Sequence, residues 1–268
     1  MKTEYKSLEG LRIQWMLGVI LGLAAELCGA VMIFKGKRGL GFAIAIAGLV
    51  AWYLIRMFGQ RKYTAGCARM RVRYGLGLED LKDAEADEIK ESVPWTGLLP
   101  SDMTADRPMF VYSFRGNWEK IPASLTELTV GFHAGSTQRQ FLTGALITLD
   151  HPCTVPGLTV IYGRPYGGIP LSHWTDKVQI DTGDRGFLML ADEPAEPDES
   201  MLDALAAFDP KHEKTAVLLT EAERVAVFLP RRFYSGTWTL FQRMPEAALS
   251  AHPLPELNEL PELLRKLA

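Results

Sequence analysis

The sequence predicts an α+β protein in which an N-terminal two-helix transmembrane hairpin precedes a mainly antiparallel-sheet soluble domain with a few helices. Two long apolar runs lie within the first sixty residues, and short segments rich in β-branched and aromatic residues follow Pro108. The expected divisions are the hairpin at 1–60, a basic and then acidic juxtamembrane linker or helix at 61–92, and the soluble α+β domain at 93–268.

Charge divides the 268-residue chain into two unlike parts. Residues 1–78 hold 12 Lys and Arg against 3 Asp and Glu, whereas residues 79–268 hold 17 against 29. A basic segment beside apolar helices suits an anionic lipid surface, and an acidic domain repels phosphate backbones. The sequence therefore predicts contact with a lipid bilayer and no binding to nucleic acid.

Each of the two apolar runs, 13–34 and 39–58, is long enough to cross a membrane. At ~1.5 Å per residue the first run reaches across a ~30 Å hydrocarbon layer, and the second is slightly shorter. Trp15 lies near the start of the first run, and Trp52 and Tyr53 lie near the end of the second, where aromatic rings prefer the headgroup level. An antiparallel pair of helices would place these rings at one face of the bilayer.

Basic residues flank the hairpin unevenly and predict its orientation. Nine positive residues lie before and after the hairpin, against three in the connecting turn. Because positive flanks stay inside, we expect a multi-pass protein of the bacterial inner (cytoplasmic) membrane, with the soluble domain and both termini cytoplasmic. The positive residues after the second run are also lipid-headgroup candidates, although the same orientation signal explains them alone. They are Arg56, Arg61, Lys62, Arg69, Arg71 and Arg73.

Glu26 is the acidic residue inside the first apolar run. An intramembrane carboxylate costs a few kcal/mol to insert, so it should face a helix, a partner or water. It could relay protons or ions, fix an oligomer, or stay neutral in a local hydrogen bond, and the lack of a second intramembrane charge disfavours the relay.

Small residues near four-residue spacing let membrane helices approach closely. The packing candidates are Gly18, Gly22, Gly29, Ala43, Ala47 and Ala51.

Beyond the hairpin, the basic stretch after Phe58 predicts a juxtamembrane helix that frays toward Gly75 and Gly77, and the acidic segment LEDLKDAEADEIKES predicts an exposed amphipathic helix.

A helix capped by Asp198 and Ser200 should precede a strand pair. The predicted strands are MFVYSF, ELTVGF, QFLTGALITL, LTVIYG, KVQID, GFLML, TAVLL and RVAVFL, with 238–241 as a further candidate. The leucines of a C-terminal helix at 257–267 should dock on the sheet or fill a partner groove.

Residues able to carry chemistry are scattered. The five histidines have no metal-binding spacing, and Cys28, Cys67 and Cys153 form no CxxC pair. Asp150 and His151 would point to opposite faces of a strand, the glycine-rich segment 162–168 lacks the Lys-Ser/Thr of a phosphate loop, and Ser172 and Ser235 lack a nucleophile elbow. The sequence therefore predicts no catalytic, cofactor-binding or metal-binding residue and no cofactor.

Short motifs recur in an order that matches a known family. They are an early-strand Gly116, the pair Thr126-Glu127, the stretch 141–144 (Phe-Leu-Thr-Gly) and the turn 157–159 (Gly-Leu-Thr). In these the chain resembles a bacterial family of two-helix membrane proteins called domain of unknown function 3137, although Leu142-Thr143 stand where that family usually has one residue. The resemblance implies the same hairpin and cytosolic domain, and it implies no activity.

The leading hypothesis is a membrane-anchored cytosolic interaction, scaffold or regulatory protein that binds a protein partner or a second copy of itself, rather than an enzyme. The alternatives are a membrane-tethered enzyme with an unrecognised site and a small transport or channel component that uses Glu26. A deep polar pocket with converging carboxylates would favour the enzyme, and an exposed apolar patch would favour binding.

Overall fold

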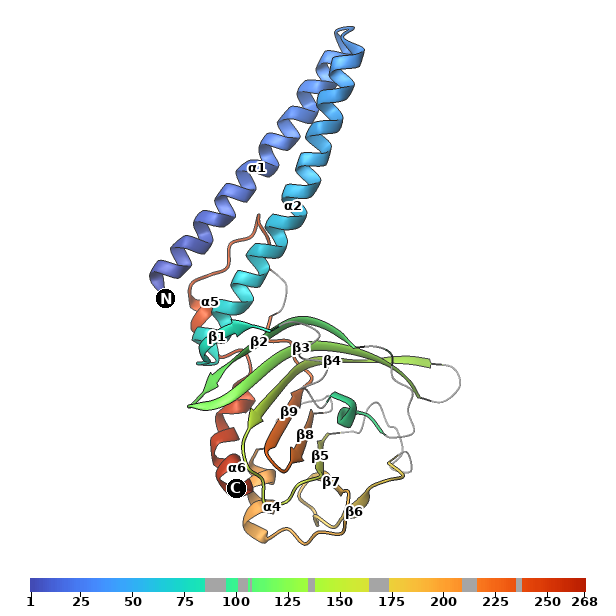
Figure 1. Cartoon of the computed structure of the whole chain (residues 1–268), viewed down its shortest axis with the longest axis vertical. Coiled ribbons are helices and arrows are strands. Elements are labelled where there is room, and N and C mark those ends of the chain that lie inside the picture. Colours follow the sequence, from blue (N-terminus) through green and yellow to red (C-terminus); the bar gives the residue numbers. More distant parts are fainter. Residues whose placement is uncertain are drawn as a thin grey trace. The chain divides into compact units, whose positions relative to one another are not determined.

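In the computed structural model the chain forms two compact units (Figure 1). The helical unit comprises Met1–Gly75 and Tyr234–Ala251, and the sheet unit comprises Leu76–Phe233 and His252–Ala268. The chain therefore passes between the units three times, after Gly75, Phe233 and Ala251. The structure describes residues 1–84, 95–100, 106, 108–134, 138–163, 174–208, 216–234 and 238–268.

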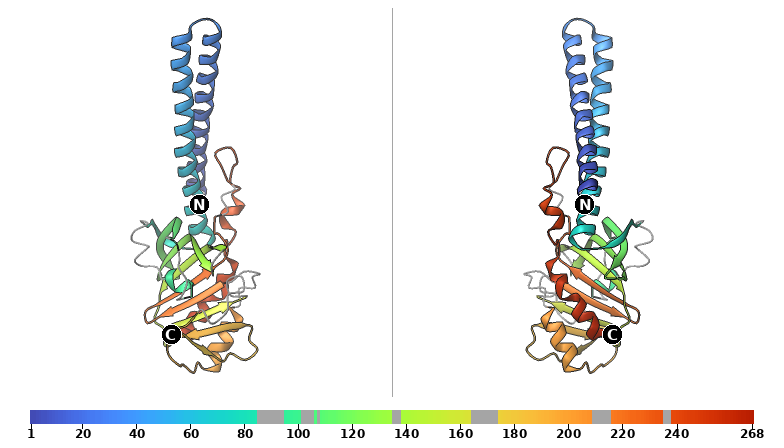
Figure 2. Two further views of the ribbon diagram at one scale, coloured as in Figure 1. Left: turned by 90° about the vertical axis from the view of Figure 1, so that its right-hand side faces the viewer. Right: turned by 90° about the vertical axis from the view of Figure 1, so that its left-hand side faces the viewer.

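The helical unit is built on two long antiparallel helices, α1 (Lys2–Phe34) and α2 (Arg38–Gly75), which run side by side along their length (Figure 2). Both are long and apolar enough to cross a membrane, and only 17% and 11% of their most apolar windows are buried. Leu27 is 68% exposed and Phe34 is 91% exposed. Such outward-facing apolar side chains suit lipid as their solvent, so the chain is membrane-associated.

Glycines set the closeness of the two helices. Gly29 lies so near α2 that a Cβ on it would come within 2.5 Å of the Ala45 nitrogen, and a Cβ on Gly48 would come within 2.6 Å of the Glu26 nitrogen. Gly22 is buried against Trp52 in the same way. These contacts let the helix backbones touch, as small residues do in lipid.

The packing face of α2 differs from the one suggested by its alanines. Ala43 and Ala47 are exposed and Ala51 is half-buried, because Gly41 and Gly48 occupy the buried face instead. Ala43 lies two residues, about 200°, from Gly41, and Ala47 lies one residue, about 100°, from Gly48, so both turn away from α1. On α1, a Cβ on Gly18 would meet the side chain of Ile55.

The described part of the sheet unit contains one nine-stranded sheet, with the order β1-β2-β3-β4-β9-β8-β5-β7-β6 and antiparallel pairing between neighbours. This arrangement, with a few helices, confirms the predicted α+β class. The strands are β1 (Glu79–Asp83), β2 (Met109–Trp118), β3 (Ile121–Ala134), β4 (Gln138–Asp150), β5 (Leu158–Tyr162), β6 (Val178–Ile180), β7 (Phe187–Ala191), β8 (Ala216–Glu221) and β9 (Arg224–Leu229).

Apolar side chains cover both faces of the central strands. Leu128 and Val130 on one face of β3 belong to the main core, to which Leu98 of η1 (Trp95–Leu98) also contributes. On the opposite face, Leu125 lines a small apolar cavity with Leu257 and Leu260. The leucines of η4 (Pro255–Glu259) and α6 (Leu260–Leu267) are thus buried within their own unit and fill no partner groove.

The remaining helices are short. In α4 (Glu199–Ala207), the Asp198 carboxylate accepts a hydrogen bond of 2.7 Å from the Met201 amide, which satisfies one of the free donors at the helix start. The helix α5 (Ala247–Ser250) packs against α2 in the helical unit.

Two sequence-based predictions of secondary structure are wrong. The acidic segment expected to form a helix begins as β1, since Lys82 and Asp83 pair with Arg115 and Phe114 of β2; residues 85–92 lie outside the described residues. Tertiary pairing overrides local helical preference there. Residues 238–241 form no strand either, because a single bridge between Thr239 and Gln242 closes a turn.

We expect Gly29→Ala to lower the free energy of unfolding of the hairpin by about 1–3 kcal/mol, because the added methyl group has only backbone atoms of α2 to displace. Gly10→Ala on the same helix is the control, since a Cβ there meets nothing within 4 Å. Unfolding in detergent micelles, followed by circular dichroism, measures both. Equal stability of the two variants would contradict the close packing at Gly29.

Candidate functional site

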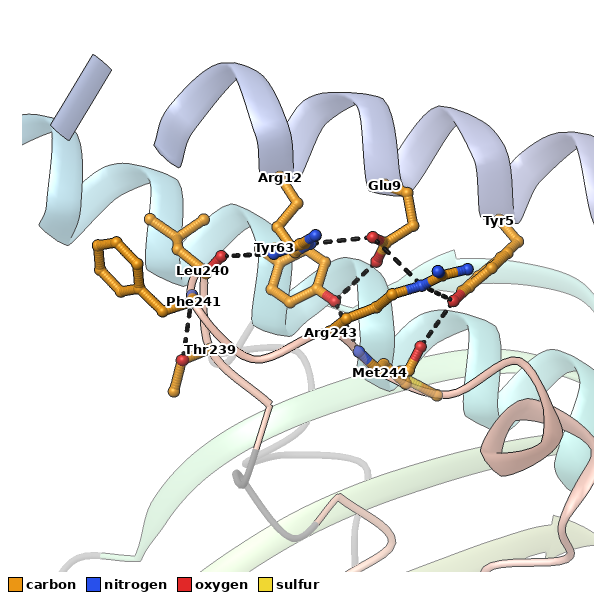
Figure 3. Close-up of polar contacts among 9 residues, drawn as sticks. All are labelled: Tyr5, Glu9, Arg12, Tyr63, Thr239, Leu240, Phe241, Arg243 and Met244. Atoms are coloured by element: carbon orange, nitrogen blue, oxygen red, sulfur yellow. Dashed lines mark hydrogen bonds and ion pairs between the residues drawn. The ribbon is translucent and has the colours of Figure 1, made fainter. Parts of the chain in front are cut away.

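The densest polar network in the described residues lies in the helical unit (Figure 3). We call it the boundary cluster and define it as Tyr5, Glu9 and Arg12 of α1, Tyr63 of α2, and Arg243. On α1 the first three residues follow each other at intervals of four and three, so they share one face of the helix. That face is turned toward residues 238–251, which we call the docked segment.

Glu9 is the centre of the boundary cluster. Its carboxylate accepts hydrogen bonds from Arg12 Nε at 2.9 Å and from the Tyr63 hydroxyl at 3.1 Å. Arg243 Nε lies 3.6 Å from the same carboxylate. The Glu9 side chain is only 12% exposed, so two guanidinium groups and a phenol replace the water that this charge gives up.

Tyr63 links the two helices to the docked segment. Its hydroxyl donates to Glu9 and accepts a hydrogen bond of 3.1 Å from the Met244 amide. The side chain is fully buried, and burial raises the pKa of the phenol above its ordinary value. The hydroxyl therefore stays protonated and keeps donating at any physiological pH.

Cys67 lies one turn further along α2, within reach of the Tyr63 hydroxyl. It is fully buried, and burial raises the pKa of its thiol to about 12. A protonated, inaccessible thiol is a poor nucleophile. Cys67 is thus a packing residue of this cluster.

Backbone groups of the docked segment complete the network. Arg12 Nη1 donates to the Leu240 carbonyl at 2.8 Å, and the Tyr5 hydroxyl donates to the Met244 carbonyl at 2.7 Å. The Gln60 side chain accepts from the Leu240 amide at 3.0 Å and donates to the Trp238 carbonyl at 3.3 Å. Because these bonds reach three residues of the docked segment, the arrangement can hold this segment in place.

The basic residues proposed for lipid headgroups have more varied environments. Arg71 lies over the Trp238 ring at 5.4 Å, its Nε is buried without a hydrogen-bond partner, and burial lowers the pKa of the guanidinium. Arg73 forms an exposed ion pair of 2.6 Å with Glu4. Arg56 and Lys62 lie over tryptophan rings, whereas Arg61 and Arg69 are exposed.

Glu26 is half-buried near the middle of the first apolar run. Its backbone nitrogen faces Gly48 of α2, and its carboxylate makes no hydrogen bond or ion pair with any described residue. The residue therefore lies against the neighbouring helix. A role of Glu26 in ion movement or oligomer contact stays a prediction.

Among the described residues of the sheet unit, polar groups line a shallow hollow of mixed charge. It is lined by Arg115, Ser124, Thr148 and the pair Asp150 and Arg224, whose charged atoms are 3.7 Å apart. Within the described residues, no three His, Cys, Asp or Glu side chains are grouped to hold a metal ion. Residues 164–168, together with Ser172, His173, His212 and Ser235, lie outside the described residues.

Two exposed apolar side chains, Met109 at the start of β2 and Phe141 near the start of β4, lie on one face of the sheet, and we call them the apolar strip. Met109 pairs with Thr129 of β3, which pairs with Thr143 of β4, and the two threonine hydroxyls are 3.1 Å apart. Residues that pair across a sheet share a face, and so do alternate residues of a strand, so Phe141 lies on that face as well. Met109 is 62% exposed and Phe141 is 60% exposed.

Sequence reasoning missed the boundary cluster because its partners are far apart along the chain. Arg12 and Leu240 are separated by 228 residues, and residues 238–241 were expected to join the sheet. The spacing of Tyr5, Glu9 and Arg12 on one helix face was the available signal, but a polar helical face is ordinarily solvated.

Comparison with known proteins adds little. No family model matches the chain, and no curated protein matches it. Among solved structures, the chain is similar to the crystal structure of the mycobacterial trehalose monomycolate transport factor A, TtfA, with 15% sequence identity and a TM-score of 0.36; the match covers 76% of this chain and 97% of that one. The fold and the helices thus define a membrane-associated α+β protein, and nothing more specific follows from this likeness.

We expect Tyr63→Phe to lower the free energy of unfolding by about 1–3 kcal/mol, because it leaves the buried Met244 amide without an acceptor and removes a donor from Glu9. The Cys67 thiol should also react faster with a water-soluble maleimide. Tyr74→Phe, which removes an exposed hydrogen bond to Glu4, is the control and should change stability by less than about 0.5 kcal/mol. Unchanged stability and labelling in Tyr63→Phe would show that the boundary cluster does not hold the docked segment.

Proposed function

We propose that this chain is a membrane-anchored interaction protein, a scaffold or regulator, of the bacterial inner membrane. The sheet unit and both termini lie in the cytoplasm in this proposal, and the sheet unit binds a segment of a partner protein. Family membership in domain of unknown function 3137 is part of the same proposal and rests on the short motifs in the sequence.

The charge of the hairpin flanks supports the orientation. Nine positive residues precede and follow the helices, against three in the turn that joins them. Arg73 is exposed despite its ion pair with Glu4, and Arg61 is exposed as well, so the flank after α2 presents positive charge to solvent. Positive charge near a membrane helix favours the cytoplasmic side.

The proposed binding function rests on the exposed apolar strip. Met109 and Phe141 each expose most of their side chain on a sheet whose other apolar residues are largely buried. Between them, Thr129 and Thr143 lie on the same face of the sheet, with their hydroxyl groups 3.1 Å apart. Exposed apolar groups on a rigid sheet typically mark an interaction site.

The net negative charge of the sheet unit favours a basic partner. The sheet unit, residues 76–233 and 252–268, holds 28 acidic against 16 basic side chains, so two copies of it repel each other. A basic segment with apolar side chains fits the apolar strip and the net negative charge of the unit better than a second copy does.

A photo-crosslinking amino acid at position 109 tests this function in native membranes. We expect an adduct with one other protein whose crosslinked peptide is basic and whose yield falls with rising salt. Phe141→Lys should remove the adduct by repelling a basic segment, and Phe141→Leu should retain it. A green fluorescent protein fused after Ala268 should fluoresce, because this reporter folds in the cytoplasm and fails to fold after export.

Other outcomes of this experiment would contradict the proposal. An adduct of twice the mass of the chain would show self-association in place of a partner. An adduct that survives Phe141→Lys would show that the strip is not the binding site, and a dark fusion protein would reverse the orientation.

A further inference from the structure

A short turn in the helical unit exposes a large aromatic side chain. The bridge between Thr239 and Gln242 closes this turn, which we call the boundary turn. Leu240 is fully buried within it, whereas the next residue, Phe241, is 59% exposed. Both side chains are apolar. In water, burial of the Phe241 ring would be favoured over its exposure.

Hydrogen bonds fix the depth of the boundary turn along the hairpin. Arg12 donates to the Leu240 carbonyl, and Gln60 bonds both Leu240 and Trp238. Arg12 directly precedes the first apolar run, and Gln60 follows the second run by two residues. The turn is therefore held at the level where the apolar surface of both helices begins.

Phe241 points toward the apolar runs. In Figure 3, Tyr5, Glu9 and Arg12 follow one another along α1, and Phe241 lies beyond Arg12 on the side away from Tyr5. That direction leads into the first apolar run. The ring thus continues the apolar surface of the helices.

The side chains around this level are typical of a membrane interface. Lys62, two residues beyond Gln60 on α2, lies over the ring of Trp15, three residues beyond Arg12 on α1, at 5.8 Å. Tryptophan rings and the long stems of Lys and Arg gather at the headgroup region, where one end of the side chain is apolar and the other is polar.

We infer that the boundary turn is a third membrane contact of this protein, in which Phe241 enters the apolar edge of the leaflet next to Arg12 and Gln60. The occupant of this surface is phospholipid, because the same depth is already occupied by lipid around the two helices. The contact is independent of the protein partner proposed above, and it would hold the docked segment between the helices and the bilayer.

An environment-sensitive fluorophore on a cysteine at position 241 tests this inference in the full-length protein reconstituted into phosphatidylcholine and phosphatidylglycerol vesicles. The native cysteines 28, 67 and 153 are replaced by alanine. We expect the fluorophore at 241 to be quenched several-fold more by spin-labelled phospholipid than by aqueous iodide. Position 58, an exposed phenylalanine at the end of the second apolar run, is the lipid control, and position 250, an exposed serine of α5, is the water control.

A second readout keeps all native cysteines. A photo-crosslinking amino acid at 241 should attach to phospholipid in intact membranes, and the same group at 250 should not. Iodide quenching at 241 equal to that at 250, or the absence of a lipid adduct, would overturn the inference. A crosslink from 241 to another protein would do the same, since it would assign this surface to a protein partner.

Discussion

Lipid as a solvent is the constraint on which the helical unit depends. The outer surfaces of α1 and α2 are apolar over two runs of about twenty residues, and only a small part of either run is buried in the chain. Water would penalise this surface heavily, whereas hydrocarbon accepts it and demands only that backbone groups be paired within each helix. Close glycine contacts then bring the two helices together without any hydrophobic drive between them.

The boundary cluster joins this membrane hairpin to a distant part of the chain. Glu9 would be a costly charge so close to lipid, but Arg12, Arg243 and Tyr63 compensate it. Arg12 and Tyr63 at the same time bind Leu240 and Met244 of the docked segment. The chain leaves the sheet unit after Phe233 and returns to it at His252, so the chain connects the units at three points.

Periodicity and composition were enough to predict the α+β class, the two apolar helices and most strands, since each of these depends on local patterns of side chains. The segment after Gly77 was expected to be a helix, but it forms β1 because it pairs with β2. Its partner residues lie more than thirty residues further along the chain, so local sequence does not reveal the pairing. Residues 238–241 resemble a strand in composition, yet hydrogen bonds from Arg12 and Gln60 shape them into a turn. Long-range pairing of this kind leaves no local signal, and for that reason the candidate site was not predicted.

Extraction of native membranes at high pH tests the account most directly. Sodium carbonate removes peripheral proteins, while chains that cross the bilayer stay in the pellet until detergent dissolves the lipid. The full-length protein should remain in the pellet, with residues 13–34 and 39–58 protected from added protease. Release into the supernatant as a stable monomer would mean that water tolerates the apolar surface of both helices, and the lipid-based interpretation of the helical unit would be wrong.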